Sequence, residues 1–225
     1  MALCGHRIDA LFKIPRFVLP SVVDMWPKSL PSLWHLQKYG GLGFATGGIM
    51  AMLLTAASEA AYPGFSVRYD AISGLGGAGA PTEVFWDGQL LIVGILWLMD
   101  TYILFHGKRK IFSPVAFYLS GTGLMMVALS PWNVYPASHY LGAQIVFLFG
   151  VLSCFAAYGI ASGPMRYVSI ASGILSLSAY IAGYIGAYSV LGPGGLERMI
   201  FYPIFLWEIC FGGYLLNRYD VKENP

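Results

Sequence analysis

Acidic, basic and imidazole side chains occupy the short polar segments that separate long apolar stretches of this chain. The candidate residues in these segments are Arg68, Asp70, Ser73, Glu83, Asp87, His139, Glu197 and Arg198. Guanidinium groups hold phosphate through paired N–H donors, and an imidazole beside a carboxylate can transfer a proton. Acids in such segments also serve solubility alone. No nucleophile–base pair is visible, so these residues predict a polar binding site and leave catalysis undecided.

Further polar residues lie within the apolar stretches themselves. They are Asp100, Ser176, Tyr180, Tyr184, Tyr188 and Glu208. A helical rise of about 1.5 Å per residue places the two acids at similar depths, roughly 15 to 20 Å from one membrane surface. A charge in the bilayer centre costs about 2.5–3.5 kcal/mol or more, so both acids should face other helices. We expect Glu208 to be protonated and hydrogen bonded to hydroxyl groups or to Asp100, as a packing contact or as part of a proton relay.

Ser176 and the three tyrosines recur every four residues, which keeps them near one face of a helix. The rest of this stretch is rich in glycine and alanine. The polar stripe should therefore face the bundle interior, where its hydroxyl groups either bond to neighbouring helices or line a polar path.

Two familiar ligand motifs are excluded. Gly74, Gly76 and Gly79 match the G-x-G-x-x-G pattern of dinucleotide-binding loops. That pattern requires a preceding strand in a soluble βαβ unit, so we predict a tight loop here instead. His139 has no second histidine nearby, and the three cysteines form no C-x-x-C pair. We therefore expect no metal site and no cofactor.

The composition indicates which class of protein positions these residues. Of 225 residues, 57% are hydrophobic and 11% are charged, whereas soluble domains carry about 25% charged residues. Long apolar stretches with so few charges are typical of polytopic membrane proteins. The net charge of +2 is too small to indicate nucleic acid as a partner.

Six apolar stretches are long enough, at roughly 20 residues, to cross a bilayer as helices. They cover approximately residues 40–59, 86–106, 111–131, 140–162, 167–190 and 199–217. The predicted fold is all-α, a polytopic bundle of six transmembrane helices over residues 40–217, because isolated strands leave backbone groups unsatisfied in lipid. Residues 1–39 form a cytoplasmic segment that lies on the membrane surface or is disordered, and residues 218–225 form a cytoplasmic tail.

The basic residues predict the orientation of the bundle. With six spans both termini share one side, and eleven Lys and Arg residues fall on that side against two on the other. Positive charges are retained in the cytoplasm. Both termini are therefore predicted to be cytoplasmic in a multi-pass protein of the cell membrane, and the candidate polar site lies outside the cytoplasm.

Three stretches resemble a known family: YDAISGLGG…EVFWDGQLLIVGIL, GLMMVALSPWN…SHYLGAQIVFLFG and GGLERMIFYPIFLWEICFGGYLL. Over roughly residues 40–217 the chain is similar to an archaeal and bacterial six-helix membrane family, the domain of unknown function nine-nine-eight. It is more distantly similar to the Frag1/DRAM membrane proteins, some of which are linked to lipid and lipid-anchor remodelling. Gly74 stands where their loop motif has Asp, so the role of that acid does not transfer. The resemblance implies six helices and an extracytoplasmic site without established catalytic residues.

Two classes of function follow from these observations. In the first, the protein binds or processes a lipid or lipid-linked head group at the extracytoplasmic site, with membrane lipids as partners. In the second, it is a non-catalytic subunit of a membrane complex with other membrane-protein subunits as partners, or a proton-coupled small-molecule transporter that uses Asp100 and Glu208.

Single cysteines placed at Ala78 and Lys110 test the predicted orientation. We expect an impermeant thiol reagent to label intact cells at position 78 and not at position 110, because the two positions lie on opposite sides of the membrane. Labelling at position 110 and not at position 78 would show that the orientation is the opposite of the predicted one.

Overall fold

The computed structural model describes residues 39–106 and 112–223. These residues form the helices α2 (Leu42–Ala61), η1 (Ile72–Gly76, a 3-10 helix), α3 (Glu83–Phe105), α4 (Phe112–Ala128), α5 (Pro136–Ala157), α6 (Pro164–Tyr184) and α7 (Gly192–Glu223). No strand occurs in this part of the chain, which confirms the all-α prediction. Residues 1–38 of the predicted N-terminal segment, the predicted cytoplasmic loop at Lys108–Lys110 and residues 224–225 of the tail lie outside the described residues.

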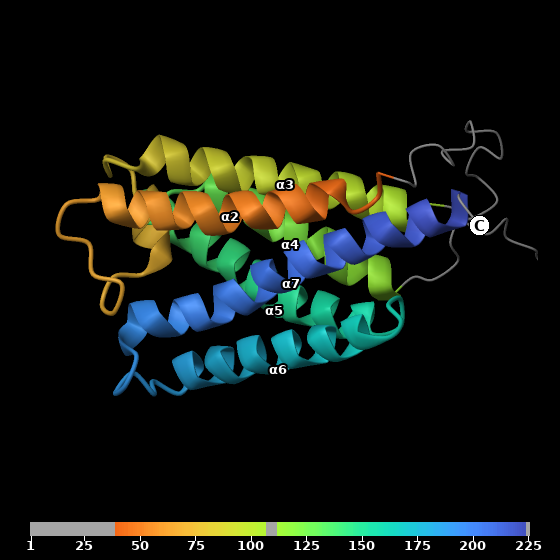
Figure 1. The fold of residues 1–225 in the computed structure, drawn as a ribbon. Coiled ribbons are helices and arrows are strands. Elements are labelled where there is room, and N and C mark those ends of the chain that lie inside the picture. The colour runs from red at the N-terminus through yellow and green to blue at the C-terminus, as the bar shows by residue number, and fades with distance from the viewer. Residues whose placement is uncertain (1–38, 107–111, 224–225) are drawn as a thin grey trace, which may run out of the picture. The chain divides into compact units, whose positions relative to one another are not determined.

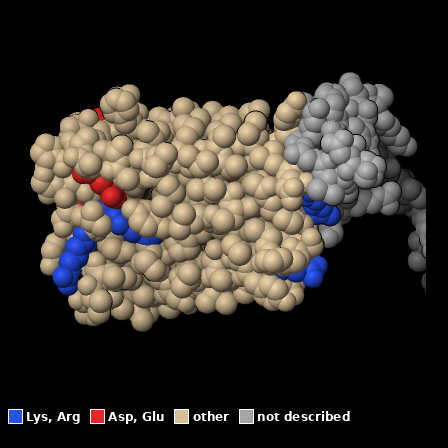
Figure 2. All heavy atoms as spheres, viewed as in Figure 1, with Lys and Arg blue, Asp and Glu red and all other residues tan. Residues whose placement is uncertain are grey.

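Five of the six α-helices are long and apolar enough to cross a membrane: α2, α3, α5, α6 and Gly192–Arg218 of α7. The remaining helix, α4, has 17 residues, and at about 1.5 Å per residue it covers about 25 Å, slightly less than the hydrocarbon thickness of a bilayer. On the face shown in Figure 2, charged side chains gather near the two ends of the bundle and uncharged atoms fill the band between them. The chain is therefore a helical multi-pass membrane protein.

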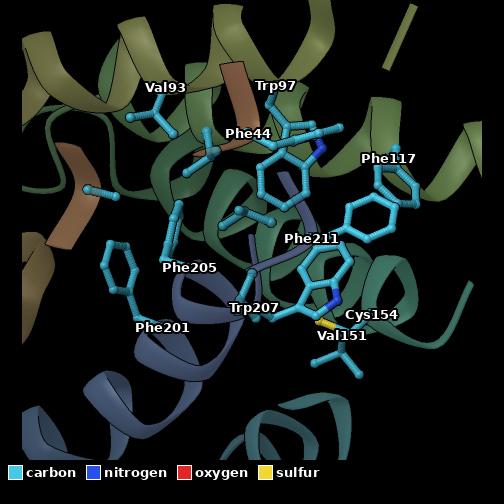
Figure 3. Packing of buried hydrophobic residues seen from close by; sticks show 14 of the residues in the cluster. Phe44, Val93, Trp97, Phe117, Val151, Cys154, Phe201, Phe205, Trp207 and Phe211 are labelled. Atoms are coloured by element: carbon cyan, nitrogen blue, oxygen red, sulfur yellow. The ribbon is translucent and has the colours of Figure 1, made fainter. Parts of the chain in front are cut away.

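Helices that follow one another in the sequence pack together, and α7 closes the bundle by packing against α2 and α6. In Figure 1, α7 runs between these two helices. Aromatic side chains fill the interface (Figure 3): the rings of Trp207 and Phe211 stack with centroids 5.0 Å apart, and Trp207 lies 6.3 Å from Trp97 of α3. Phe44 of α2 meets Trp97 edge-on at 5.4 Å. This buried cluster fixes α2, α3 and α7 against one another.

Several predicted helix boundaries shift in the structure. α5 begins at Pro136 and not at residue 140, because proline is favourable in the first turn of a helix. α6 ends at Tyr184 and not at residue 190, and Gly186 and Gly192 follow it with positive φ angles of 73° and 72°. α7 starts at Gly192 and not at residue 199. Tyr188 consequently lies in the α6–α7 connection, which corrects its assignment to a membrane span.

α2 and α7 approach each other closely at Gly212. A Cβ atom at this position would lie 2.4 Å from the backbone nitrogen of Ala45 and 2.5 Å from the carbonyl oxygen of Gly41. A Cβ atom at Gly213, the next residue, would meet no atom within 4 Å. The close contact between α2 and α7 therefore requires a glycine at position 212, whereas position 213 has room for a side chain.

Gly212→Leu is expected to destabilise the protein by about 1–3 kcal/mol or more, because the new side chain must push α2 away from α7. Gly213→Leu makes the same change one position later and should have little effect. Thermal unfolding of both purified variants in detergent measures the difference. Equal unfolding temperatures would contradict the close packing at Gly212.

Candidate functional site

The α2–α3, α4–α5 and α6–α7 connections share one end of the bundle, which we call the η1 end (Figure 1). Acidic side chains hold the α2–α3 connection there. Glu197 of α7 accepts a hydrogen bond from the N–H of Ile72 at 2.6 Å, at the start of η1. Asp70 accepts one from the N–H of Ser66 at 2.6 Å. These bonds satisfy amides that the turns themselves leave without a partner.

Arg198, the residue after Glu197, joins α7 to α2. The residue is 3% exposed, and its guanidinium contacts Oε1 of Glu59 through Nε at 2.8 Å and through Nη2 at 2.7 Å. Its Nη1 also donates to the carbonyl oxygens of Asp70 at 3.1 Å and Gly194 at 2.8 Å. The contacts of Arg198 therefore join α2, α7 and the α2–α3 connection.

A cavity of about 620 Å³ opens between the α2–α3 connection, α5, the end of α6 and α7; we call it the η1 cavity. Its polar lining residues are Asp70, Ser73, His139, Gln144 and Glu197, and its aromatic lining residues are Tyr62, Phe65, Tyr69, Trp132, Tyr140, Phe147 and Tyr188. A small apolar pocket that reaches Leu90 and Leu124 shares part of this lining, including His139 and Glu197. The structure thus brings four of the eight predicted site residues to one cavity: Asp70, Ser73, His139 and Glu197.

His139 is the buried imidazole of this cavity, with 4% of its surface exposed. Its Nδ1 lies 2.8 Å from the carbonyl oxygen of Ser130. Because a carbonyl can only accept, Nδ1 carries the proton and donates. In the neutral ring, Nε2 is then an acceptor, and it has no hydrogen-bond partner among the described residues.

The other four predicted site residues do not line the η1 cavity. Arg198 is paired with Glu59 as described above. Arg68 is exposed and donates to the carbonyl oxygen of Ser189 at 3.3 Å. Glu83 accepts from the N–H of Gly79 at 2.7 Å, at the start of α3. Asp87 packs against Gly76, where an added Cβ would lie 2.2 Å from its Oδ1. The predicted role of the arginines in holding a phosphate inside the site has no geometric support in this arrangement.

The two acids of the membrane spans have different surroundings. Asp100 is 4% exposed and accepts hydrogen bonds from the N–H groups of Gly41 at 2.9 Å and Phe44 at 2.8 Å, so it caps the start of α2 from α3. Glu208 is fully buried beside Gly47. Neither of its oxygens has a hydrogen-bond partner among the described residues. The bonds expected from Glu208 to hydroxyl groups or to Asp100 are therefore not formed.

The predicted polar stripe of α6 does not form one continuous path. The hydroxyl of Ser176 donates to the carbonyl oxygen of Ile200 at 2.7 Å, and the hydroxyl of Tyr180 donates to Oε1 of Gln144 on α5. Tyr184 is 87% exposed. Tyr188 donates to the carbonyl oxygen of Gly183 at 2.8 Å and lines the η1 cavity. These hydroxyl groups serve helix packing and, at one end, the cavity wall.

α5 contributes a face to the cavity that was not predicted from the sequence. His139, Tyr140, Ala143, Gln144 and Phe147 all line it. Their spacing of one, three, one and three residues is that of a single helix face. A polar Gln144 on the same face as His139 was the signal in the sequence that could have identified this wall.

Arg198→Ala is expected to destabilise the protein by about 3–5 kcal/mol, because Glu59 then keeps a charge in a buried place without its partner. Arg68→Ala removes the same side chain from an exposed position at the same end and should change stability by no more than about 0.5 kcal/mol. Unfolding in detergent compares the two variants. A larger loss for Arg68→Ala would contradict the assignment of Arg198 as the residue that joins the helices.

Comparison with known proteins places this arrangement in a family. No curated protein and no solved structure matches the chain. A family model described as a protein of unknown function (DUF998) matches residues 45–214, which extend from the first turn of α2 to the last third of α7 and include the whole η1 cavity. The match confirms the family resemblance of the sequence, and since it covers well over half of the chain, the protein belongs to the DUF998 family.

Proposed function

We propose that the protein binds the polar head of a membrane lipid, or of a lipid-linked group, in the η1 cavity. The observation that carries this proposal is the cavity itself, with a volume of about 620 Å³ and walls that combine aromatic rings with a few polar groups. Sites for small molecules have volumes of roughly 300–1,000 Å³ and the same mixture of apolar walls and converging polar groups.

The position of the cavity suits a lipid head group. The cavity lies where spanning helices end, and lipid head groups occupy that level of a bilayer. Tyr and Trp are enriched at this level because their rings are apolar and their tips are polar. Trp132 and Tyr140 line the cavity and are also exposed, with 42% and 61% of their surfaces accessible. These rings support entry of a ligand from the membrane surface.

The same proposal includes the location and orientation of the protein. We place it in the cell membrane with the η1 end outside, since eleven of the thirteen Lys and Arg residues fall on the other side of the predicted spans. Arg166 and Arg218, at the start of α6 and near the end of α7, belong to that basic side. The η1 cavity then faces the outer leaflet.

The geometry favours binding over the other functions considered. No hydroxyl or thiol is hydrogen bonded to His139 within the described residues, so a paired nucleophile and base is not assembled there. Transport through Asp100 receives little support, because both hydrogen bonds of its carboxylate hold the start of α2. The role of a subunit in a membrane complex has no feature of the described residues in its favour.

Ala143→Phe tests the proposal, because Ala143 lines both the η1 cavity and the adjoining pocket and a phenyl ring there fills space that a ligand would occupy. We expect native mass spectrometry of the purified variant to show lipid retention lowered roughly tenfold or more, as an overlap costing about 1.4 kcal/mol would produce.

The matched control is Ala171→Phe, which makes the same change at an exposed position of α6 that does not line the cavity. This variant should retain lipid like the unaltered protein. If both variants retain lipid equally well, the bound lipid lies elsewhere and the proposed function is wrong.

A further inference from the structure

The charged residues that line the η1 cavity are both acids. Asp70 and Glu197 belong to its wall. The guanidinium of Arg198 is directed to Glu59 and to backbone carbonyl oxygens, and that of Arg68 donates to a carbonyl oxygen outside the cavity lining. Among the described residues, therefore, the full charges on the cavity wall are negative.

The carboxylates and the imidazole of the wall offer acceptors, beside hydroxyl, amide and indole groups that can donate. Asp70 accepts the N–H of Ser66 and Glu197 accepts the N–H of Ile72, each at 2.6 Å. A carboxylate has about four acceptor sites, so both side chains can accept further hydrogen bonds. His139, 4% exposed, uses Nδ1 as a donor to Ser130, which leaves the lone pair of Nε2 as a further acceptor without a partner among the described residues. A phosphate needs donors, preferably charged ones, and this wall offers it no cation.

Aromatic rings surround these acceptors on several sides. Tyr62 and Trp132 come from the connections, Tyr140 from α5 and Tyr188 from the α6–α7 connection. The ring of Tyr69 already faces the guanidinium of Arg68, 5.4 Å from its centroid. The faces of such rings carry partial negative charge and attract ammonium groups, including quaternary ones, within about 6 Å. Rings and carboxylates together make a wall that is favourable for a cation and unfavourable for an anion.

We propose, on the basis of the binding function above, that the head group held in the η1 cavity carries an ammonium group, either a primary amine or a quaternary ammonium. Asp70 and Glu197 supply the opposite charge, the aromatic rings contact its methyl or methylene groups, and Nε2 of His139 accepts a hydrogen bond where the ligand has an N–H. A phosphate attached to the same head group stays outside the acidic part of the wall.

The test uses the full-length protein, purified in detergent and freed of native lipid. Phosphatidylcholine, phosphatidylethanolamine, phosphatidylglycerol and choline are added separately, and native mass spectrometry measures the retained ligand. The first three share the phosphate and differ in the ammonium group. We expect retention of one of the two ammonium lipids to exceed that of phosphatidylglycerol at least about tenfold.

Asp70→Asn and Glu197→Gln remove one negative charge each and keep an oxygen that can accept the N–H of Ser66 or Ile72. Each should lower the retention of the ammonium lipid about five- to tenfold and leave phosphatidylglycerol unchanged or better retained. Glu83→Gln is the matched control, because Glu83 also accepts a backbone N–H at the η1 end but does not line the cavity. If a cavity variant fails to fold, the proposal is tested by the unaltered protein alone, through its retention of the ammonium lipids relative to phosphatidylglycerol.

The outcomes separate the two proposals. Equal retention of phosphatidylglycerol and the ammonium lipids, abolished by Ala143→Phe, would overturn the ammonium proposal and leave the binding function in place. Retention of no added ligand would overturn the binding function itself. Choline that binds as tightly as phosphatidylcholine would support the ammonium site and identify a free ammonium compound as the ligand, whereas weaker choline binding would support it and identify the lipid.

Discussion

The first backbone N–H groups of a helix have no partner within that helix, and next to lipid little water is present to supply one. Carboxylates from other elements take this place here. Asp100 reaches from α3 to the start of α2, and Glu197 reaches from α7 to the start of η1. Each bond joins segments that are far apart in the sequence, so the bonds that satisfy these amides also fix the positions of the helices relative to one another. The η1 cavity depends on this constraint, because Glu197 holds η1 at the position where it forms part of the wall.

α2 accommodates two buried carboxyl groups because its inner face carries glycine. An added Cβ at Gly43 would lie 3.0 Å from Cγ of Asp100, and one at Gly47 would lie 3.2 Å from Oε1 of Glu208. These glycines are one helical turn apart, so the two acids pack against adjacent turns of the same helix. Asp100 has two N–H donors there, whereas Glu208 has no hydrogen-bond partner among the described residues. A buried charge without a partner is far more costly than a neutral carboxyl group, so Glu208 fits its place as an uncharged acid.

The sequence predicts the helices better than the partners of the polar side chains. Hydropathy located six helices because each buries or exposes to lipid a long apolar stretch, and the order of the connections placed His139 and Glu197 at the same end. It could not predict that Arg198 binds Glu59, 139 positions earlier, or that Asp100 caps a helix 56 to 59 positions away. Such pairs depend on the orientation of each helix about its own axis, and neither composition nor local spacing predicts that orientation. Hydropathy likewise overestimated the length of α6, since it counts apolar residues and does not detect where the backbone turns.

The charge of the η1 cavity follows from the rotation of α7 about its own axis. Adjacent residues of a helix point about 100° apart, so Glu197 faces η1 and the cavity while Arg198 faces α2 and Glu59. The stacking of Trp207 and its contact with Trp97 fix this rotation further along the same helix. A rotation by about 100° that turned Arg198 toward the cavity would replace the carboxylate of the wall by a guanidinium, which would favour an anion, and would leave Glu59 without its partner. The acidic wall that we propose for an ammonium group is therefore determined by the aromatic packing of the bundle as much as by the residues of the connections.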